Sequence, residues 1–372
     1  MRRSLLDYLC CPQCKCGFEL RVLEETEDQV SEGLLRCKDN RHLYPVVRSV
    51  PRILPTAFEH EIDFSIKYRE FISDHELITS GVAGATEKTK LSFGRQWTTY
   101  HVQRFNEDRA YFCSKTATDP ASLKGKLVLD AGCGSGRYTK IVAESEATVI
   151  GVDLSPAVET AASNTAHLSN VHIIQADVFQ LPLLPSSYDF IFSIGVLHHT
   201  PNTKRALSAL IPLLSANGEI AVWVYPRWPT PVELYNQSLR AITTRMSLDN
   251  LHRMAVALEP VGLLKLRLLT ASDWWKRILG QLLRGLTIGV SYHPDREIRI
   301  CDTFDWFSPP YQWHHTDEEL ESWLREFGLV DIRNLSMGQV HYQYNYGNGV
   351  NFKARRPHKK GGQLLGWSST NT

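Results

Sequence analysis

Aspartates end three apolar segments in the middle of the chain, and glycines follow the first of them. Residues 126–130 (KLVLD), 148–153 (TVIGVD) and 171–177 (VHIIQAD) each end in an aspartate, and AGCGSGRY follows the first. A buried parallel strand that enters a glycine-rich turn and then a helix has this pattern. Glycines let the backbone approach a ligand closely, and carboxylates accept hydrogen bonds from its hydroxyl and amino groups. We therefore predict a ligand site where these segments end.

The glycine spacing separates this site from two common phosphate-binding loops. Gly132, Gly134 and Gly136 form G-x-G-x-G, whereas the dinucleotide fingerprint is G-x-G-x-x-G. No Gly-Lys-Ser/Thr follows, which excludes a P-loop. Asp153 lies 21 residues after Gly132 (153 − 132), about where a ribose-binding carboxylate belongs. Asp177 is placed to accept a hydrogen bond from an adenine amino group.

Two further apolar segments, residues 188–194 and 218–225, extend the series to five, and helical segments separate them. Helices between consecutive strands indicate a parallel sheet with helices on both faces. Ligands of such sheets bind at the carboxyl ends of the strands, which is where the three aspartates lie. A role as a helix cap or turn former could explain any one of these acids. It is a poor explanation for three acids at successive strand ends.

The five segments together resemble the class I S-adenosylmethionine-dependent methyltransferases, with a domain like methyltransferase type 11. The resemblance rests on VLDAGCGSGRYT, GVDLSP, QADVFQLPL, YDFIFSIGVLHH and GEIAVWV, which match in order and spacing between residues 128 and 224. It implies an α/β fold with a seven-stranded Rossmann-like sheet and helices on both faces. It also implies S-adenosyl-L-methionine as cofactor and an acceptor that supplies the nucleophile.

The resemblance assigns roles to individual residues. Asp130 orients the loop and the methionine ammonium group, Asp153 takes the ribose hydroxyls, and Asp177 takes the adenine amine. The glycines admit the methionine part of the cofactor. The complete expected cofactor set is Asp130, Gly132, Cys133, Gly134, Gly136, Asp153, Leu154, Asp177, Val178 and Leu197.

Histidines follow the fourth apolar segment directly. His198 and His199 are our candidates for the base that removes a proton from the acceptor, because imidazole exchanges protons near neutral pH. The same position can instead only shape the pocket. Tyr225, Tyr311, His314 and His315 are further candidates for the base. The expected acceptor-binding residues are Arg95, Trp97, Tyr225, Tyr311, His314 and His315.

The N-terminal segment has the residues of a structural metal site. Cys11 and Cys14 form a CxxC knuckle, and Cys37 and His42 follow at the end of an expected hairpin. Two thiolates two residues apart can reach one ion, so we predict a Cys3His zinc site. The segment resembles the zinc-ribbon-like module that precedes the catalytic domain of some rRNA guanine methyltransferases. It departs from that pattern at Asn40, so a ribbon that has lost its metal is the alternative.

We divide the chain at its proline- and glycine-rich breaks. A zinc-ribbon-like module is followed by a helical lid or linker, a cofactor-binding core, a helical insertion after the fifth strand, the C-terminal part of the fold and a disordered tail. The boundaries are 1–56, 57–118, 119–225, 226–310, 311–355 and 356–372.

The insertion is leucine-rich and basic, and three interpretations compete for it. Helical spacing with Trp274, Trp275, Lys276, Arg277 and Arg284 favours a cap over the acceptor pocket. The same residues also suit a helix that lies on a membrane surface, with tryptophans at the interface and basic residues toward lipid headgroups. A dimerisation surface is the third interpretation.

Composition narrows the function classes. Among 372 residues, 41 basic and 40 acidic side chains give a net charge of +1, so no global charge favours nucleic acid. The sequence lacks an apolar run of membrane-spanning length and a secretory h-region, so we expect a cytoplasmic protein with at most peripheral membrane contact.

We expect methyl transfer to a small apolar or conjugated molecule, with the acceptor atom (O, C or N) left open. An RNA methyltransferase is the alternative, supported by the zinc module and by basic residues near the C-terminus. A non-catalytic cofactor-binding protein is a third hypothesis. It would require damaged cofactor residues, and none of the expected ones is damaged.

Overall fold

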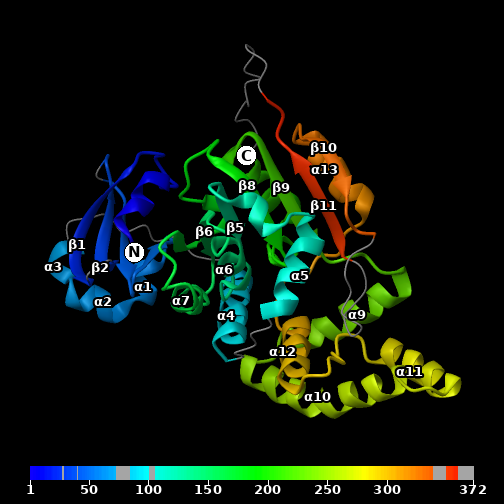
Figure 1. Cartoon of the computed structure of the whole chain (residues 1–372). Helices are drawn as coiled ribbons and strands as arrows, with labels where there is room; N and C mark the ends of the chain where they lie inside the picture. The colour runs from blue at the N-terminus through cyan, green and yellow to red at the C-terminus, as the bar shows by residue number, and fades with distance from the viewer. Residues whose placement is uncertain (27–28, 40, 73–83, 100–104, 338–348, 359–372) are drawn as a thin grey trace.

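The computed structural model describes residues 1–26, 29–39, 41–72, 84–99, 105–337 and 349–358 (Figure 1). Within these ranges eleven strands form one sheet, in the order β1-β2-β3-β4-β7-β6-β5-β8-β9-β11-β10. The strands are β1 (Phe18–Thr26), β2 (Gln29–Cys37), β3 (Leu43–Val47), β4 (Val50–Ile53), β5 (Leu127–Ala131), β6 (Thr148–Asp153), β7 (Val171–Ala176), β8 (Tyr188–Ile194), β9 (Leu214–Val224), β10 (Val330–Asn334) and β11 (Val350–Arg355).

The last seven strands form the expected Rossmann-like core. Strands β7, β6, β5, β8 and β9 run parallel, so their carboxyl ends meet at one edge. Strands β11 and β10 close the sheet by antiparallel pairing. The predicted α/β fold is therefore confirmed for this part of the chain.

The sheet is larger than the seven strands that we expected. Strands β1–β4 form antiparallel pairs, and β4 then pairs parallel to β7, with Ile53 opposite Ala176. Strand β7 would otherwise leave a row of backbone groups unpaired at the edge of the core. The N-terminal module therefore extends the core sheet instead of forming a separate sheet.

A buried arginine links the module to the core. Arg52 on β4 is 1% exposed, and its guanidinium donates to Glu159 at 2.7 Å and to Gln175 at 3.3 Å. Glu61 lies 3.3 Å from the same guanidinium, and Arg48 also pairs with Glu159 at 2.5 Å. Paired acids on both sides of the junction compensate for burial of the charge.

Alternation along the core strands places apolar side chains on both faces. Val128 and Val149 pack toward Phe112, whereas Leu129 and Ile150 belong to the cluster on the opposite face. Successive strand residues point to opposite faces, so a strand covered by helices on both sides is apolar throughout.

The helices that cover these faces, together with the shorter N-terminal helices, are α1 (Ala57–His60), α2 (Ile62–Lys67), α3 (Arg69–Ile72), α4 (Gly84–Thr99), α5 (Phe105–Thr116), α6 (Arg137–Ala143), α7 (Val158–Asn164), α8 (Thr203–Leu210) and α13 (Asp317–Glu326). Helix α13 begins with a capping box between Thr316 and Glu319, as its sequence predicts.

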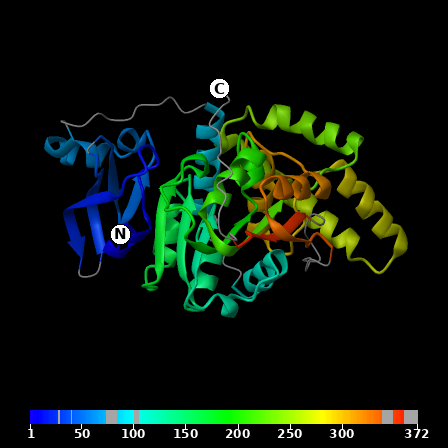
Figure 2. The same cartoon turned by 90° about the horizontal axis from the view of Figure 1, so that it is seen from above.

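Four helices occupy the chain between β9 and α13. They are α9 (Thr230–Thr243), α10 (Leu248–Leu269), α11 (Trp274–Leu286) and α12 (Arg296–Phe307). Figures 1 and 2 place α10 and α11 at the end of the molecule opposite the N-terminal module. None of the helices in the described ranges is both long and apolar enough to cross a bilayer.

Buried His172 should make the stability of the junction sensitive to acid. Its ring lies 5.8 Å from that of Tyr8, and burial together with the nearby Arg2 lowers its pKa to about 4. Between pH 6.5 and 4 the unfolded chain binds a proton that the native chain does not, so stability falls as the pH falls through that range. The contribution is at most roughly 3 kcal/mol.

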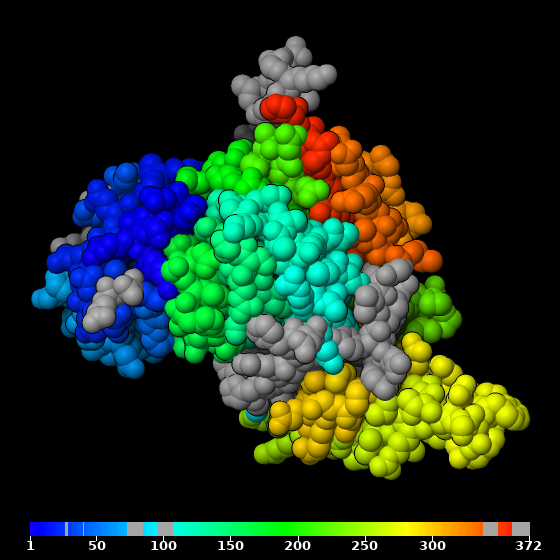
Figure 3. Space-filling model, viewed as in Figure 1, coloured from blue at the N-terminus to red at the C-terminus, as the bar shows by residue number. Residues whose placement is uncertain are grey.

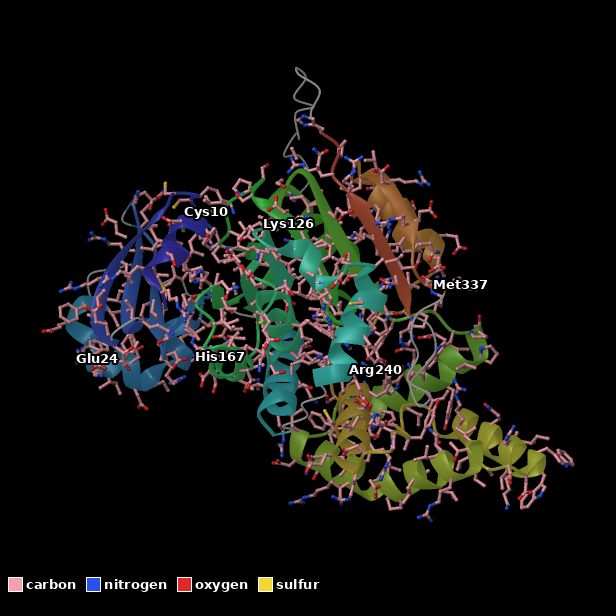
Figure 4. The ribbon with its side chains drawn as sticks, viewed as in Figure 1. Cys10, Glu24, Lys126, His167, Arg240 and Met337 are labelled. Atoms are coloured by element: carbon pink, nitrogen blue, oxygen red, sulfur yellow. The ribbon has the colours of Figure 1, made fainter. Side chains whose placement is uncertain are left out.

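We expect His172→Gln to flatten the pH dependence of the free energy of unfolding, measured by urea titration between pH 7 and pH 4.5. His167→Gln, at an exposed position five residues earlier in the chain (Figure 4), is the matched control. Equal slopes for His172→Gln and the unsubstituted chain would contradict this assignment.

Candidate functional site

A cavity of about 350 Å³ lies at the carboxyl ends of the parallel strands. This volume is at the small end of the range that ligand pockets occupy, roughly 300–1,000 Å³. The loop after β5 and the ends of β6 and β7 form one wall. Helices α4, α5 and α12 and the ends of β8 and β9 form the rest.

The glycine-rich loop can approach a ligand because its backbone adopts conformations that side chains resist. Gly132, Gly134 and Gly136 all have positive φ, of 94°, 53° and 79°. A Cβ on Gly132 would lie 2.3 Å from a methyl group of Val196 in the loop after β8. The loop and the end of β8 therefore pack without room for a side chain between them.

Asp153 connects the glycine loop to the end of β6. One carboxylate oxygen accepts from Gly134 N at 2.9 Å, and the other accepts from the N and Oγ of Ser155 at 2.8 and 2.6 Å. Burial raises the pKa of Asp153, and the Ser155 hydrogen bonds act in the opposite direction. Asp177 lines the same wall and caps a short turn by accepting from Phe179 N at 2.9 Å.

Asp130 lies behind the loop, outside the cavity lining. It is 2% exposed and accepts a hydrogen bond from Thr139 Oγ1 at 2.6 Å. Burial raises its pKa to about 7. Asp130 therefore braces the start of α6, and its predicted role toward the methionine ammonium group stays a prediction. Gly136 and Leu197 also lie outside the lining, whereas the predicted Gly132, Cys133, Gly134, Asp153, Leu154, Asp177 and Val178 all form part of it.

The opposite wall is aromatic. The rings of Tyr225 and Trp306 stack at 5.3 Å with an interplanar angle of 20°, and Trp228 stacks on Trp306 at 5.3 Å and 16°. Phe93 from α4 and Tyr311 complete this side. Buried Arg240 (Figure 4) donates to the carbonyls of Trp306 and Pro309, both at 2.5 Å, and so anchors α9 to this wall.

The two adjacent histidines have different environments. His199 lines the cavity, and its Nδ1 lies 2.9 Å from the Tyr311 carbonyl, so Nδ1 is the donor and Nε2 carries the lone pair. Burial lowers the pKa of His199 to about 3. His198 is fully buried outside the lining, where its ring packs 4.0 Å from Tyr225. Within the described residues neither ring nitrogen of His198 has a hydrogen-bond partner.

Other expected acceptor-binding residues have structural partners. His314 Nδ1 pairs with Glu233 at 2.6 Å, and His315 binds Thr203 at 3.0 Å on the way to α13. Arg95 pairs with Asp249 at 2.5 Å. These three lie outside the cavity lining, and the side chain of Trp97 lies outside the described residues.

Several polar lining residues escaped the sequence analysis. Asp108, Tyr111 and Lys115 line the cavity from α5, and Asp302 and Asp305 line it from α12. The ammonium nitrogen of Lys115 lies 3.4 Å from the ring centroid of Trp223, and burial lowers its pKa. The spacing of residues 108, 111 and 115 puts them on one face of a helix and was the only sequence signal for a shared site. The same spacing occurs on any helix that packs against a core, so it does not identify cavity-lining residues.

The predicted metal-ligand residues come together in the N-terminal module. The ligand atoms of Cys11, Cys14, Cys37 and His42 lie within 4.8 Å of one another. His42 Nδ1 is 3.4 Å from the Cys11 sulfur and 3.5 Å from the Cys37 sulfur. Tetrahedral zinc bonds of roughly 2.3 Å to sulfur and 2.1 Å to nitrogen would separate such atoms by about 3.5 Å, so the set fits zinc.

Comparison with known proteins identifies the central segment. Residues 129–222 match the family model described as a methyltransferase domain. A ubiquinone biosynthesis O-methyltransferase of Coxiella burnetii is 32% identical over 101 residues, which is 27% of this chain and 43% of that protein. A tRNA U34 carboxymethyltransferase of Desulfotalea psychrophila is 31% identical over 104 residues, or 26% and 32% of the two chains.

A solved structure is similar over a larger part of the chain. It is the 1,6-didemethyltoxoflavin-N1-methyltransferase of Burkholderia thailandensis with S-adenosylhomocysteine bound, at 18% identity and a TM-score of 0.38, covering 75% of this chain and 93% of that one. The chain spans less than half the length of either the ubiquinone or the tRNA relative. The residues that match the family model form a methyltransferase domain, and the flanking module and insertion lie outside that match.

The contact between Gly132 and Val196 should make the loop intolerant of any side chain. We expect Gly132→Ala to lower the free energy of unfolding by about 2–4 kcal/mol, from left-handed backbone strain plus overpacking. Gly125→Ala is the matched control, because Gly125 also has positive φ (70°) but open space around its Cβ position. It should cost about 1–2 kcal/mol. Equal losses in urea unfolding would show that the contact with Val196 adds nothing.

Proposed function

We propose that this protein transfers a methyl group from S-adenosyl-L-methionine to a small apolar or conjugated acceptor by in-line displacement. One observation carries the proposal. The glycine loop, Asp153 and Asp177 share a cavity with an aromatic wall built largely by the insertion and the segment that follows it. The cofactor would bind on the glycine-loop wall and the acceptor on the aromatic wall. This arrangement would align the two reactants, which is the main requirement of in-line methyl transfer.

The cofactor wall has free acceptor capacity where the nucleoside would bind. Each carboxylate has about four lone-pair positions. Asp153 uses some of them for the loop, and Asp177 uses one oxygen for Phe179 N. The remaining positions can accept the ribose hydroxyls at Asp153 and the adenine amine at Asp177. The bound cofactor supplies an activated sulfonium methyl group.

The acceptor wall suits a flat, weakly polar molecule. Tyr225 and Trp228 stack on Trp306, which is 3% exposed, and this aromatic cluster forms an apolar wall that favours conjugated ligands. Lys115, Asp302 and Asp305 supply polar groups at this side of the cavity and would orient polar substituents. Helices α4 and α12 cover it as a lid and a cap.

His199 is our proposed base. It lines the cavity, and because its Nδ1 donates to the Tyr311 carbonyl, its Nε2 carries the lone pair. It would take the proton that the acceptor loses as the new bond to carbon forms. His198 would shape the pocket by packing against Tyr225.

RNA remains the alternative acceptor, favoured by the name of the tRNA-modifying relative and by the metal-type cluster. The basic residues near the C-terminus give it less support. Lys353 pairs with Glu219 at 2.9 Å, and Arg355 pairs with Asp331 at 2.5 Å. The charge of both is therefore compensated within the chain. Lys359 and Lys360 lie outside the described residues.

For the N-terminal module we propose a structural zinc ion held by Cys11, Cys14, Cys37 and His42. A module this small buries little core of its own, so metal coordination would supply part of its folding free energy. The site would hold the turn after Cys10, whose backbone N donates to the Pro182 carbonyl of the core at 3.0 Å. None of the four proposed ligands lines the cavity, which is consistent with a structural role.

The acceptor class can be tested with methyl-labelled S-adenosylmethionine and an extract of the source cells, separated into RNA, protein and organic-extractable fractions. We expect label in the organic fraction, and loss of label with Asp153→Asn. Trp306→Ala should reduce that label at least tenfold while S-adenosylhomocysteine binding, measured by calorimetry, stays within about twofold, because Trp306 lies on the acceptor wall.

Exposed Glu144→Ala, in the same domain, is the matched control and should retain full label transfer. Label in RNA would replace the proposed acceptor with the alternative. No label in any fraction, together with no S-adenosylhomocysteine binding, would overturn methyl transfer itself.

The zinc proposal predicts about one zinc ion per chain by elemental analysis. Cys14→Ser should lower the zinc content and the thermal midpoint together. Cys113→Ser is the control, because Cys113 lies on α5 of the core and belongs to neither group of described residues that could hold a metal ion, and it should keep the zinc content. A zinc-free protein whose midpoint is unchanged by a chelator would contradict the proposal.

A further inference from the structure

Helix α11 leaves its apolar face exposed. Six large apolar side chains along it are 48–73% exposed, although they share one side of the helix: Trp274, Trp275, Ile278, Leu279, Leu282 and Leu286. At 100° per residue these six positions span about 140° of the helix surface. Such a stripe normally faces a core, and within the described residues no element covers it.

The rest of the fold holds α11 so that this face points outward. On the opposite side, a Cβ added to Gly280 would lie 3.0 Å from the backbone nitrogen of Leu269 in α10. The last turn is tied to α9, because Tyr235 Oη donates to the Leu286 carbonyl at 2.7 Å. In the space-filling view the yellow end of this helical pair extends beyond the body of the molecule (Figure 3).

Basic residues border the apolar stripe on both sides. The helical positions of Arg277 and Arg284 lie at one edge and that of Lys276 at the other. Residues 261–290 contain five Lys or Arg and one Asp, a net charge of +4 (5 − 1). The single acid, Asp273, pairs with Lys276.

We propose that α11 docks the protein on an anionic lipid bilayer, lying in the plane of the interface. The tryptophans and aliphatic side chains would enter the boundary between headgroups and acyl chains, and the bordering Arg277 and Arg284 would contact headgroup phosphates. Amphipathic helices with this composition bind in that way, and anionic lipid adds attraction for each basic residue near the surface.

Charge favours a bilayer over a second copy of the chain. A two-fold contact through this face would bring the basic borders of both copies together, and like charges across an interface repel. An anionic surface compensates the same charges. Because the insertion also supplies α12 to the cavity wall, docking and acceptor binding share one scaffold, but docking does not depend on the proposed methyl transfer.

The test is co-sedimentation of the full chain with vesicles of phosphatidylcholine alone or with 30% phosphatidylglycerol. We expect at least tenfold tighter binding to the anionic vesicles, weakened by salt, with a blue shift in tryptophan fluorescence. Ile278→Asp/Leu282→Asp should weaken binding at least tenfold, and Arg277→Glu/Arg284→Glu should abolish the preference for anionic lipid.

Ile62→Asp/Ile66→Asp is the matched control, because both side chains are exposed on α2 in the distant N-terminal module. It should bind vesicles like the unsubstituted chain, and circular dichroism would verify that all variants fold. Absence of binding to anionic vesicles would overturn the proposal, as would equal losses in the control. A dimer in solution that Ile278→Asp/Leu282→Asp dissociates, without vesicle binding, would assign this face to a second copy instead.

Discussion

Parallel pairing of β5 with both β6 and β8 is the constraint on which the rest of the site depends. It puts the carboxyl ends of these strands at one edge, so residues far apart in sequence meet there. The loop after β5 must then turn against the loop after β8, and Gly132 is needed because Val196 occupies the space of a Cβ. The same register lets Asp153 accept the Gly134 amide. Cavity, loop and carboxylates thus follow from one backbone arrangement.

Extension of this sheet by the N-terminal module has a cost, because the junction buries charge. Arg52 is almost fully buried, and Glu61, Glu159 and Gln175 come from three separate segments to pair with its guanidinium. Removal of one acidic partner would leave the buried guanidinium charge unpaired. This destabilises a protein more than replacement of the whole ion pair by apolar residues. The module and the core should therefore unfold as one cooperative unit.

The aromatic side of the cavity is built differently from the side that holds the glycine loop. Asp153 and Asp177 come from the ends of adjacent strands, whereas Lys115, Tyr225 and Trp306 come from a helix before the core, a strand end and the insertion. Contacts between the segments stabilise this assembly: Ser92 of α4 lies 2.5 Å from Ser308, and Lys88 donates to the Met246 carbonyl at 2.8 Å. Sequence changes in the insertion would thus alter the aromatic wall while they leave the glycine-loop wall unchanged.

The sequence by itself determined the core strands, the glycine loop and the residues of the metal-type cluster, because each depends on local periodicity or on ligands spaced within one short segment. It predicted α13 from its capping box for the same reason. It did not determine that β4 would pair with β7, that Asp130 would face Thr139 behind the loop, or that His199 rather than His198 would line the cavity. Tertiary structure decided these points, since edge pairing, side-chain direction and burial depend on segments distant in sequence. Lys115, Asp302 and Asp305 carried no local signal that distinguishes a cavity-lining side chain from one on an ordinary packed helix.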